Sequence, residues 1–314
     1  MGRALPGRAA AHSDRTSPLD PSGDVSVVIV VYRTPDVLAE CLRSFEQHRP
    51  RRVGEVVVVD NSADGSDAPS SPWIAYERNA ENVHFRGGVN QGVRRASLPY
   101  VFVLNPDTYV TDSESIAKLA ETLDHDPSIG FVAPKLRGDD GNLAPQGERV
   151  AGLAYLLGVK TYANAAWPGN PIARRHSRAR LSRDLSGPAD TVSAAAVLVR
   201  RDEFLAVGGF DERALMYWEE HELAKKLGRL GLHGWYRADA FLFHHWRKGG
   251  TEQVASADAE RCFQEAMRLY YRMFYGRFGG FAFDVLDAVQ RVIRAARRGA
   301  RGSAGPPRAD RPPA

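Results

Sequence analysis

The sequence has few cysteines and no apolar run long enough to cross a membrane. Its two cysteines, Cys41 and Cys262, stand far apart and outside any CxxC spacing, which argues against a disulfide framework and against a zinc site. No apolar segment approaches the roughly 18 to 20 residues that a spanning helix needs, and residues 1–23 lack the apolar core of a secretory signal. We therefore expect a cytoplasmic protein.

Two nucleotide-binding motifs are also missing. Neither a P-loop nor a GxGxxG fingerprint is present, which argues against P-loop nucleotide enzymes and against dehydrogenases. The net charge of +4 is small for 314 residues, but arginine is concentrated in residues 174–183 and 291–301. Such local clusters favour an anionic partner at these places, and we expect no nucleic-acid partner.

The most informative stretch is VFVLNPDTYV, residues 101–110. The short apolar run Tyr100 to Leu104 is typical of a parallel strand that is buried on both faces. Pro106 has no N–H group to give to a sheet, so Asp107 should lie just beyond the carboxyl end of this strand. Ligands of open α/β sheets bind at that edge, although Asn-Pro-Asp alone would also suit an ordinary turn.

Earlier segments repeat this pattern of a buried strand with a polar end. Residues 24–31 predict a strand that leads through Tyr32 and Arg33 into a helix, and residues 53–59 predict a second strand that ends on Asp60. A third strand is expected around residues 74–76. Strands that alternate with helices indicate an α/β fold with a mostly parallel central sheet flanked by helices.

The middle of the chain continues the alternation and then loses it. We expect a helix over 113–123, strands over 130–134 and 191–199, and a short helix over 201–207. Residues 138–189 show no clear periodicity, and we interpret them as a functional lid, with a disordered insert as the alternative. This segment contains a group of basic residues: Arg174, Arg175, His176, Arg178, Arg180 and Arg183.

Three glutamates begin the next predicted helix, in which Leu223, Leu227 and Leu230 should face the core. Acidic residues favour a helix N-terminus through its dipole, but the dipole does not require three of them. A strand over 235–243 then ends on two histidines, which are either metal ligands or packed side chains. The glutamates are Glu219, Glu220 and Glu222, and the histidines are His244 and His245.

The end of the chain predicts two helices, over 258–275 and 281–298. The second has one apolar face and several arginines off that face, which suits either docking on the domain or lying on an anionic membrane at the inner face of the cell. The apolar residues are Phe281, Val285, Leu286, Val289, Val292, Ile293 and Ala296. We expect a disordered leader (1–23), one catalytic domain (24–275), a basic amphipathic helix (276–301) and a disordered tail (302–314).

Taken in order, four stretches resemble the family 2 inverting glycosyltransferases with a GT-A fold, in particular their bacterial rhamnosyltransferase-like branch. They are VSVVIVVYRTPDVLAECLRSF, VVVVDNSADGS, NVHFRGGVNQGVRRA followed by LNPD, and VLVRRDEFLAVGGFDERALMYWEEHEL followed by HHWRKGG. The resemblance covers most of residues 24–275. It implies a GT-A fold with a C-terminal helical extension, and an enzyme that transfers a sugar from a nucleotide-diphosphate donor.

The resemblance also implies roles for individual residues. Asp107 and His245, or its neighbour His244, would hold a divalent cation, Mg²⁺ or Mn²⁺, on the donor diphosphate. Glu220 would be the general base that takes the acceptor proton. The donor would be held by Tyr32, Arg33, Asp60, Gly87, Gly88, Asn90, Asn105 and Asp107. The acceptor side would include Trp218, Glu219 and Glu222.

Two features depart from the family pattern. Glu219-Glu220-His221-Glu222 stands where the family has Glu-Asp-x-Asp, so the proposed base is one methylene longer. The histidines are also followed by Trp246, which alters the usual spacing to glycine. A catalytically weak or silent domain that binds a nucleotide or glycan is therefore the alternative to an active enzyme.

The resemblance favours dTDP-L-rhamnose as donor, with UDP-hexoses next. The expected acceptor is a glycan or a sugar carried on a polyprenyl diphosphate. Gly87 and Gly88 admit two interpretations: close approach of the backbone to a phosphate, or a tight turn into a helix.

Overall fold

In the computed structural model, the described residues are 17, 19–63, 68–69, 71–143, 149–160, 171, 184–245 and 256–302. The strands are β1 (Val25–Val31), β2 (Val53–Asp60), β3 (Ile74–Arg78), β4 (Tyr100–Leu104), β5 (Thr108–Val110), β6 (Ile129–Arg137), β7 (Gly187–Ala189), β8 (Ala196–Arg200) and β9 (His233–His244). The helices are α1 (Pro35–His48), α2 (His84–Arg95), α3 (Ser115–His125), α4 (Leu153–Lys160), α7 (Arg201–Ala206), α8 (Glu219–Gly228) and α9 (Ser256–Gly302).

The strands of the described residues form one nine-stranded sheet in the order β3-β2-β1-β4-β8-β6-β9-β5, with β7 paired to β9. The first four are parallel to one another, and β6 is parallel to β9. The antiparallel strand β8 lies between β4 and β6, so β6 and β9 run in the same direction as β4. The carboxyl ends of β1, β2, β3, β4, β6 and β9 therefore meet at one edge, and the prediction of a mostly parallel sheet is confirmed.

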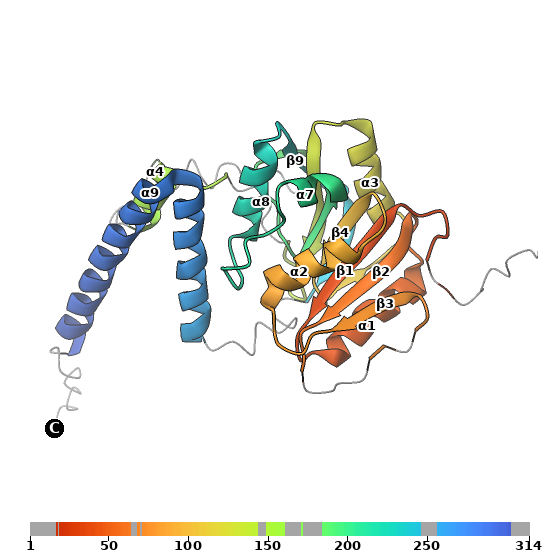
Figure 1. Ribbon diagram of the computed structural model, residues 1–314, viewed down its shortest axis with the longest axis horizontal. Helices are drawn as coiled ribbons and strands as arrows, with labels where there is room; N and C mark the ends of the chain where they lie inside the picture. Colours follow the sequence, from red (N-terminus) through yellow and green to blue (C-terminus); the bar gives the residue numbers. More distant parts are fainter. Residues whose placement is uncertain are drawn as a thin grey trace, which may run out of the picture.

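Helices cover both faces of this sheet (Figure 1). Alternate residues of β1 face opposite sides: Val27 and Ile29 pack with α1 and α3, whereas Val28 and Val30 pack with α2, α7 and α8. All seven residues of β1 are buried. This explains why, apart from Ser26, its sequence is a run of β-branched residues and not an alternation of apolar and polar residues.

The glycines of α2 let this helix lie close to the sheet. A Cβ atom on Gly88 would lie 2.7 Å from Val30 Cγ1, and one on Gly92 would lie 2.4 Å from Val28 Cγ1. Gly87 and Gly88 are therefore inside the helix, not in a turn before it. Their observed role is helix–sheet packing, while contact with a phosphate stays a prediction.

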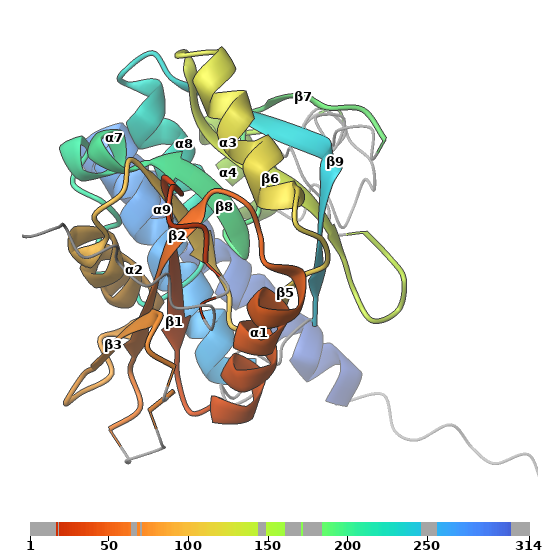
Figure 2. The ribbon, with the colours of Figure 1, turned by 90° about the vertical axis from the view of Figure 1, so that its right-hand side faces the viewer.

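The two C-terminal helices are present as predicted and form the arms of α9, joined by a kink at Gly276 (φ 64°). The first arm packs on α4 and on the loop before α8 through Met267, Tyr270 and Tyr271. Figure 1 shows the second arm beyond the first, away from the sheet, and Figure 2 shows α9 on the far side of the sheet. Within the described ranges, none of the helices combines the length and the apolar character needed to cross a bilayer.

Some sequence expectations differ from the structure. Leu230 is 51% exposed because α8 ends at Gly228, so the chain has already turned away from the core. The strand expected over 191–199 begins only at Ala196, and the irregular segment contains the helix α4 and the strand β7. Its arginines at 174–183 lie outside the described residues, as do residues 1–16 and 303–314. Residues 19–23 of the expected leader pack on β2, where the Asp20 N–H donates to Val53 O (2.8 Å).

Candidate active site

Polar side chains from distant parts of the sequence meet at the carboxyl edge of the sheet. Asp60 ends β2, Asp107 follows β4 and His244 ends β9. The Asn105 N–H donates to Ala195 O (2.8 Å), and the adjacent Ala194 makes a backbone hydrogen bond to the carboxylate of Glu220. The start of α8 is thereby placed next to the end of β4.

Asp60 is almost completely buried and is held by three residues. Its carboxylate accepts hydrogen bonds from the Ser62 N–H (2.7 Å), the Tyr76 hydroxyl and Arg78 Nε (3.3 Å). Burial alone would raise its pKa, but these hydrogen bonds outweigh burial and lower the pKa of Asp60. An ionised, fixed carboxylate of this kind is suited to accept a hydrogen bond from a base edge.

Tyr32 and Arg33 lie beside Asp60, as expected. The Arg33 N–H donates to Ser62 Oγ (2.7 Å), and its guanidinium lies 5.2 Å from the centre of the Tyr32 ring. Arg33 has a left-handed backbone (φ 54°), which is uncommon for a residue with a side chain. The loop after β1 is therefore tied to the loop after β2, and their side chains share one region.

Asp107 lies next to His244, and both side chains are buried. His244 Nε2 lies 3.3 Å from Asp107 Oδ1, because the antiparallel pairing of β5 with β9 brings Thr108 opposite His244. The neighbouring His245 donates its backbone N–H to Asp107 O (2.8 Å), while its ring pairs with Asp139. The imidazole beside Asp107 is thus that of His244, not that of His245.

The ligand types at this position fit a hard divalent cation. The Asp107 carboxylate is the kind of ligand that Mg²⁺ and Mn²⁺ prefer, whereas the imidazole of His244 suits transition metals and so favours Mn²⁺ over Mg²⁺. Among the residues that the structure describes, however, no group of three or more His, Cys, Asp and Glu side chains is arranged to hold a metal. Two protein ligands leave most coordination positions open, so a cation here would need further oxygens from a bound molecule.

The three glutamates of α8 have different surroundings. Arg86 of α2 is 2% exposed, forms an ion pair with Glu222, and lies 3.5 Å from Glu219. Lys226 Nζ lies 2.7 Å from the other oxygen of Glu222. Glu222 is thus paired with two cations, whereas burial raises the pKa of Glu219 despite the nearby Arg86. Glu220 forms no ion pair with Arg86 or Lys226, although the charge of Arg86 lowers its pKa slightly.

Glu220 is partly buried and stands at the sheet edge. Burial and the nearby charge of Glu219 raise the pKa of Glu220 to about 7, although hydrogen bonds to backbone N–H groups oppose this rise. A carboxylate with a pKa near neutrality can accept a proton and later release it, which is the requirement for a general base.

The backbone just before α8 is strained. Tyr217 (φ 72°) and Trp218 (φ 68°) both adopt the left-handed conformation, which costs on the order of 1–3 kcal/mol per residue. Arg86 Nη2 donates to Tyr217 O (2.5 Å), and the Trp218 ring packs against Tyr270 (5.1 Å between ring centres). These contacts hold the strained turn from which the three glutamates begin.

Several site residues were not found from the sequence. Tyr76 and Arg78, which bind Asp60, alternate along β3 and so share one face, a signal that could have been used. Arg86 gave no such signal, because its partners lie more than 120 residues away. Asn90, expected at the donor, is hydrogen-bonded to the backbone of Phe210. Its amide nitrogen donates to Phe210 O, and its amide oxygen accepts from the Phe210 N–H (2.8 Å each).

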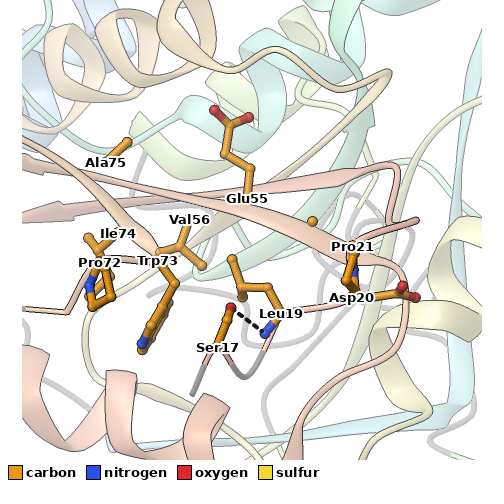
Figure 3. Close-up of a pocket in the computed structure, with 11 residues that line it drawn as sticks. Ser17, Leu19, Asp20, Pro21, Glu55, Val56, Pro72, Trp73, Ile74 and Ala75 are labelled. Carbon is orange, nitrogen blue, oxygen red and sulfur yellow. Dashed lines mark hydrogen bonds between the residues drawn. The ribbon is translucent and has the colours of Figure 1, made fainter. Parts of the chain in front are cut away.

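A separate pocket of about 460 Å³ lies at the opposite edge of the sheet, by the amino ends of β2 and β3 (Figure 3). Leu19, Trp73 and Ile74 contribute to its wall, and Figure 3 shows Trp73 and Leu19 side by side. It contains none of the residues expected in the donor or acceptor site.

Solved structures identify the fold class. The chain superposes on GalNAc-T7, solved with UDP, GalNAc and Mn²⁺, with a TM-score of 0.55 and 17% identity, covering 78% of this chain and 48% of that one. For residues 1–349 of TarS from S. aureus the TM-score is 0.52 with 17% identity, covering 84% and 69%. The fold is that of the GT-A glycosyltransferases.

Sequence comparison gives the family. The model of "Glycosyl transferase family 2" matches residues 26–187, and the chain belongs to this family. It is also 28% identical over 233 residues to the N-acetylglucosaminyl-diphospho-decaprenol L-rhamnosyltransferase of Mycobacterium tuberculosis, covering 70% of this chain and 75% of the relative. The protein is therefore a glycosyltransferase that uses a nucleotide-sugar donor.

Proposed function

We propose that the protein is an inverting rhamnosyltransferase that transfers L-rhamnose from dTDP-L-rhamnose to a sugar on a polyprenyl diphosphate, in the synthesis of a cell-surface polysaccharide. The observation that carries the catalytic part is the position of Glu220, which lies at the sheet edge beside the end of β4, while the ion pairs of Arg86 are with Glu219 and Glu222. The rhamnosyltransferase of M. tuberculosis, at 28% identity, supports the choice of sugar and acceptor.

In this proposal the base of the nucleotide lies against Asp60, Tyr32 and Arg33. Asp60 is ionised and fixed, so it accepts the N3–H of thymine or uracil. Asn105 and Asp107 then face the diphosphate, because they directly follow the strand next to β1. Gly87, Gly88 and Asn90 act indirectly, by setting how closely α2 lies against this edge.

Asp107 and His244 would hold a divalent cation. When bound, Mn²⁺ or Mg²⁺ would neutralise the negative charge that builds up on the leaving diphosphate. His245 supports this arrangement through its backbone N–H to Asp107 O. The presence of Mn²⁺ in the structure of GalNAc-T7 supports the choice of ion.

Glu220 performs the proton transfer. Its carboxylate takes the proton of the acceptor hydroxyl while that oxygen attacks the anomeric carbon, and the bond to the diphosphate oxygen breaks on the opposite face of the sugar. The configuration at the anomeric carbon is thereby inverted. Glu219 and Glu222 hold the turn at Trp218 and so shape the acceptor side.

A lipid-linked acceptor would place the enzyme at the inner face of the cell membrane as a peripheral protein. The test is turnover of dTDP-L-rhamnose and a panel of UDP-hexoses with a synthetic polyprenyl-diphosphate N-acetylglucosamine, with the product's anomeric configuration read by NMR. We expect an inverted rhamnosyl product. Binding of nucleotide without turnover of any donor would favour the alternative of a silent binding domain, and a retained configuration would contradict inversion.

A further inference from the structure

The second arm of α9 carries a stripe of exposed apolar side chains. Five large apolar residues between 278 and 292 are each 43% to 69% exposed: Phe278, Phe281, Val285, Val289 and Val292. Their spacing of three and four residues puts them within roughly 80° of arc around the helix, at about 100° per residue. One continuous side of the arm is therefore apolar and open to solvent.

This stripe is not the side with which the arm packs on the protein. Phe283 is buried and Leu286 is half-buried in the cluster that contains Tyr270 and Tyr271 of the first arm. Gly279 allows the close approach, since a Cβ atom there would lie 2.5 Å from Tyr271 O. The arm is thus docked through one side while the apolar stripe stays exposed.

The charge of the arm selects an anionic partner. Residues 277–302 contain six arginines, no lysine and only two acidic residues, Asp284 and Asp287. Both aspartates already form ion pairs, with Arg268 (2.6 Å) and Arg291 (3.2 Å). Pairing with a second copy of this helix would bring two strongly basic segments together, whereas an anionic lipid leaflet would attract them.

A hollow at the kink joins the basic and apolar features. It has a volume of about 540 Å³ and is lined by Arg268, Arg272, Arg277, Phe278, Gly280, Phe281 and Asp284. The guanidinium groups suit the phosphates of lipid headgroups. The two exposed phenylalanines beside them suit the boundary between headgroups and acyl chains.

We propose that the second arm of α9 lies in the plane of an anionic membrane, with Phe278, Phe281, Val285, Val289 and Val292 inserted among the acyl chains and the arginines on the headgroups. This rests on the proposed function for its biological purpose, since it brings the enzyme to a lipid-linked acceptor. The first arm contacts Trp218, directly before the catalytic helix α8, so the attached membrane would lie on the side of the active site from which α8 begins.

The test is co-sedimentation of the full-length protein with vesicles of phosphatidylcholine that contain about one third phosphatidylglycerol. We expect binding to these vesicles, little binding to pure phosphatidylcholine, and release at high salt. Changing Phe281→Gln and Val289→Gln together should weaken partition roughly tenfold or more. Leu230→Gln is the matched control, because Leu230 is equally apolar and exposed but lies outside α9.

Equal partition of the double variant and the wild type, or no binding of the wild type, would overturn the proposal. A concentration-dependent dimer in sedimentation velocity without lipid that the double variant abolishes would assign the stripe to a second copy instead. Vesicle binding needs no donor or acceptor, so the two proposals can fail separately. Sugar transfer without vesicle binding would overturn only the membrane proposal. Vesicle binding without sugar transfer would contradict only the proposed function. Circular dichroism of each variant verifies that the exposed substitutions leave the fold intact.

Discussion

Arg86 of α2 and Glu222 of α8 form an ion pair in which the side chains are 2% and 3% exposed, although 136 residues separate them in the sequence. Arg86 also binds the backbone oxygens of Asp211 (3.2 Å) and Tyr217 (2.5 Å). One side chain from the donor half of the sheet therefore fixes the turn and helix that carry the proposed base.

We predict that Arg86→Met destabilises the protein by about 3–5 kcal/mol, because it leaves the buried Glu219 and Glu222 without their main cation. Urea unfolding followed by circular dichroism measures this. Arg94→Met is the control, since Arg94 is on the same helix and exposed, and it should change stability by less than about 0.5 kcal/mol. Similar midpoints for both variants would show that the buried pair does not hold α8.

Asp107→Asn should abolish the Mn²⁺-dependent part of nucleotide binding while the fold stays intact. The amide keeps the size of the side chain but removes the charge that a cation needs. Calorimetric titration of dTDP with and without Mn²⁺ gives the result. Asp139→Asn is the matched control, because Asp139 pairs with His245 instead. In the same titration, His244→Gln should lose Mn²⁺-dependent nucleotide binding and His245→Gln should keep it. Loss in His245→Gln alone would assign the ion to His245.

The pKa of Glu220 predicts a pH dependence of stability. Because folding raises this pKa from 4.5 to about 7, the folded state binds the proton more tightly than the unfolded state. The resulting stabilisation is complete below about pH 4.5 and is lost as the pH rises through about 7. Glu220→Gln removes this loss. As the pH rises from about 5 to about 8.5, the free energy of unfolding of the variant should therefore increase relative to that of wild type by on the order of 1–3 kcal/mol.

Thermal unfolding of both proteins across this range measures the difference. In wild type, kcat/KM should fall on the acidic side of the same pKa, since only the ionised carboxylate accepts a proton. A constant stability difference between Glu220→Gln and wild type at all pH values would contradict the raised pKa.

Gly92→Ala should destabilise the protein by about 1–3 kcal/mol, because its Cβ atom would lie 2.4 Å from Val28 Cγ1 in a fully packed region. Gly228→Ala provides the comparison, because a Cβ atom added there would meet nothing within 4 Å outside its own helix and alanine favours a helix. Denaturant midpoints of the two variants should therefore move in opposite directions. If Gly92→Ala left the midpoint unchanged, the close approach of α2 to β1 would be incorrect.

The sequence predicted the parts of this protein that depend on local pattern. The β-branched run of β1, the stop at Pro106 and the acidic start of α8 each gave the correct element and the correct polar end. Contacts between distant segments were not predictable in this way. No local pattern marks Arg86 as buried, and only the fold shows that it packs against the glutamates of α8.

The choice between two adjacent histidines shows the same limit. His244 and His245 are equivalent in sequence, and the register of β9 with β5 decides which ring lies beside Asp107. The apolar face of the last helix was visible from the sequence, but which of its residues dock was not. Leu286 packs with Phe283 in the aromatic cluster, whereas Phe281, Val285, Val289 and Val292 remain exposed.

The central claim is that Glu220 is the catalytic base, and turnover by Glu220→Gln compared with Glu222→Gln tests it most directly. With dTDP-L-rhamnose and the polyprenyl-diphosphate acceptor, Glu220→Gln should lower kcat by roughly two to four orders of magnitude while calorimetry shows unchanged dTDP affinity. Glu222→Gln should chiefly lower stability, because it weakens the contacts to Arg86 and Lys226. Near wild-type turnover by Glu220→Gln would contradict the account, and an inactive but stable Glu222→Gln would transfer the role of base to Glu222.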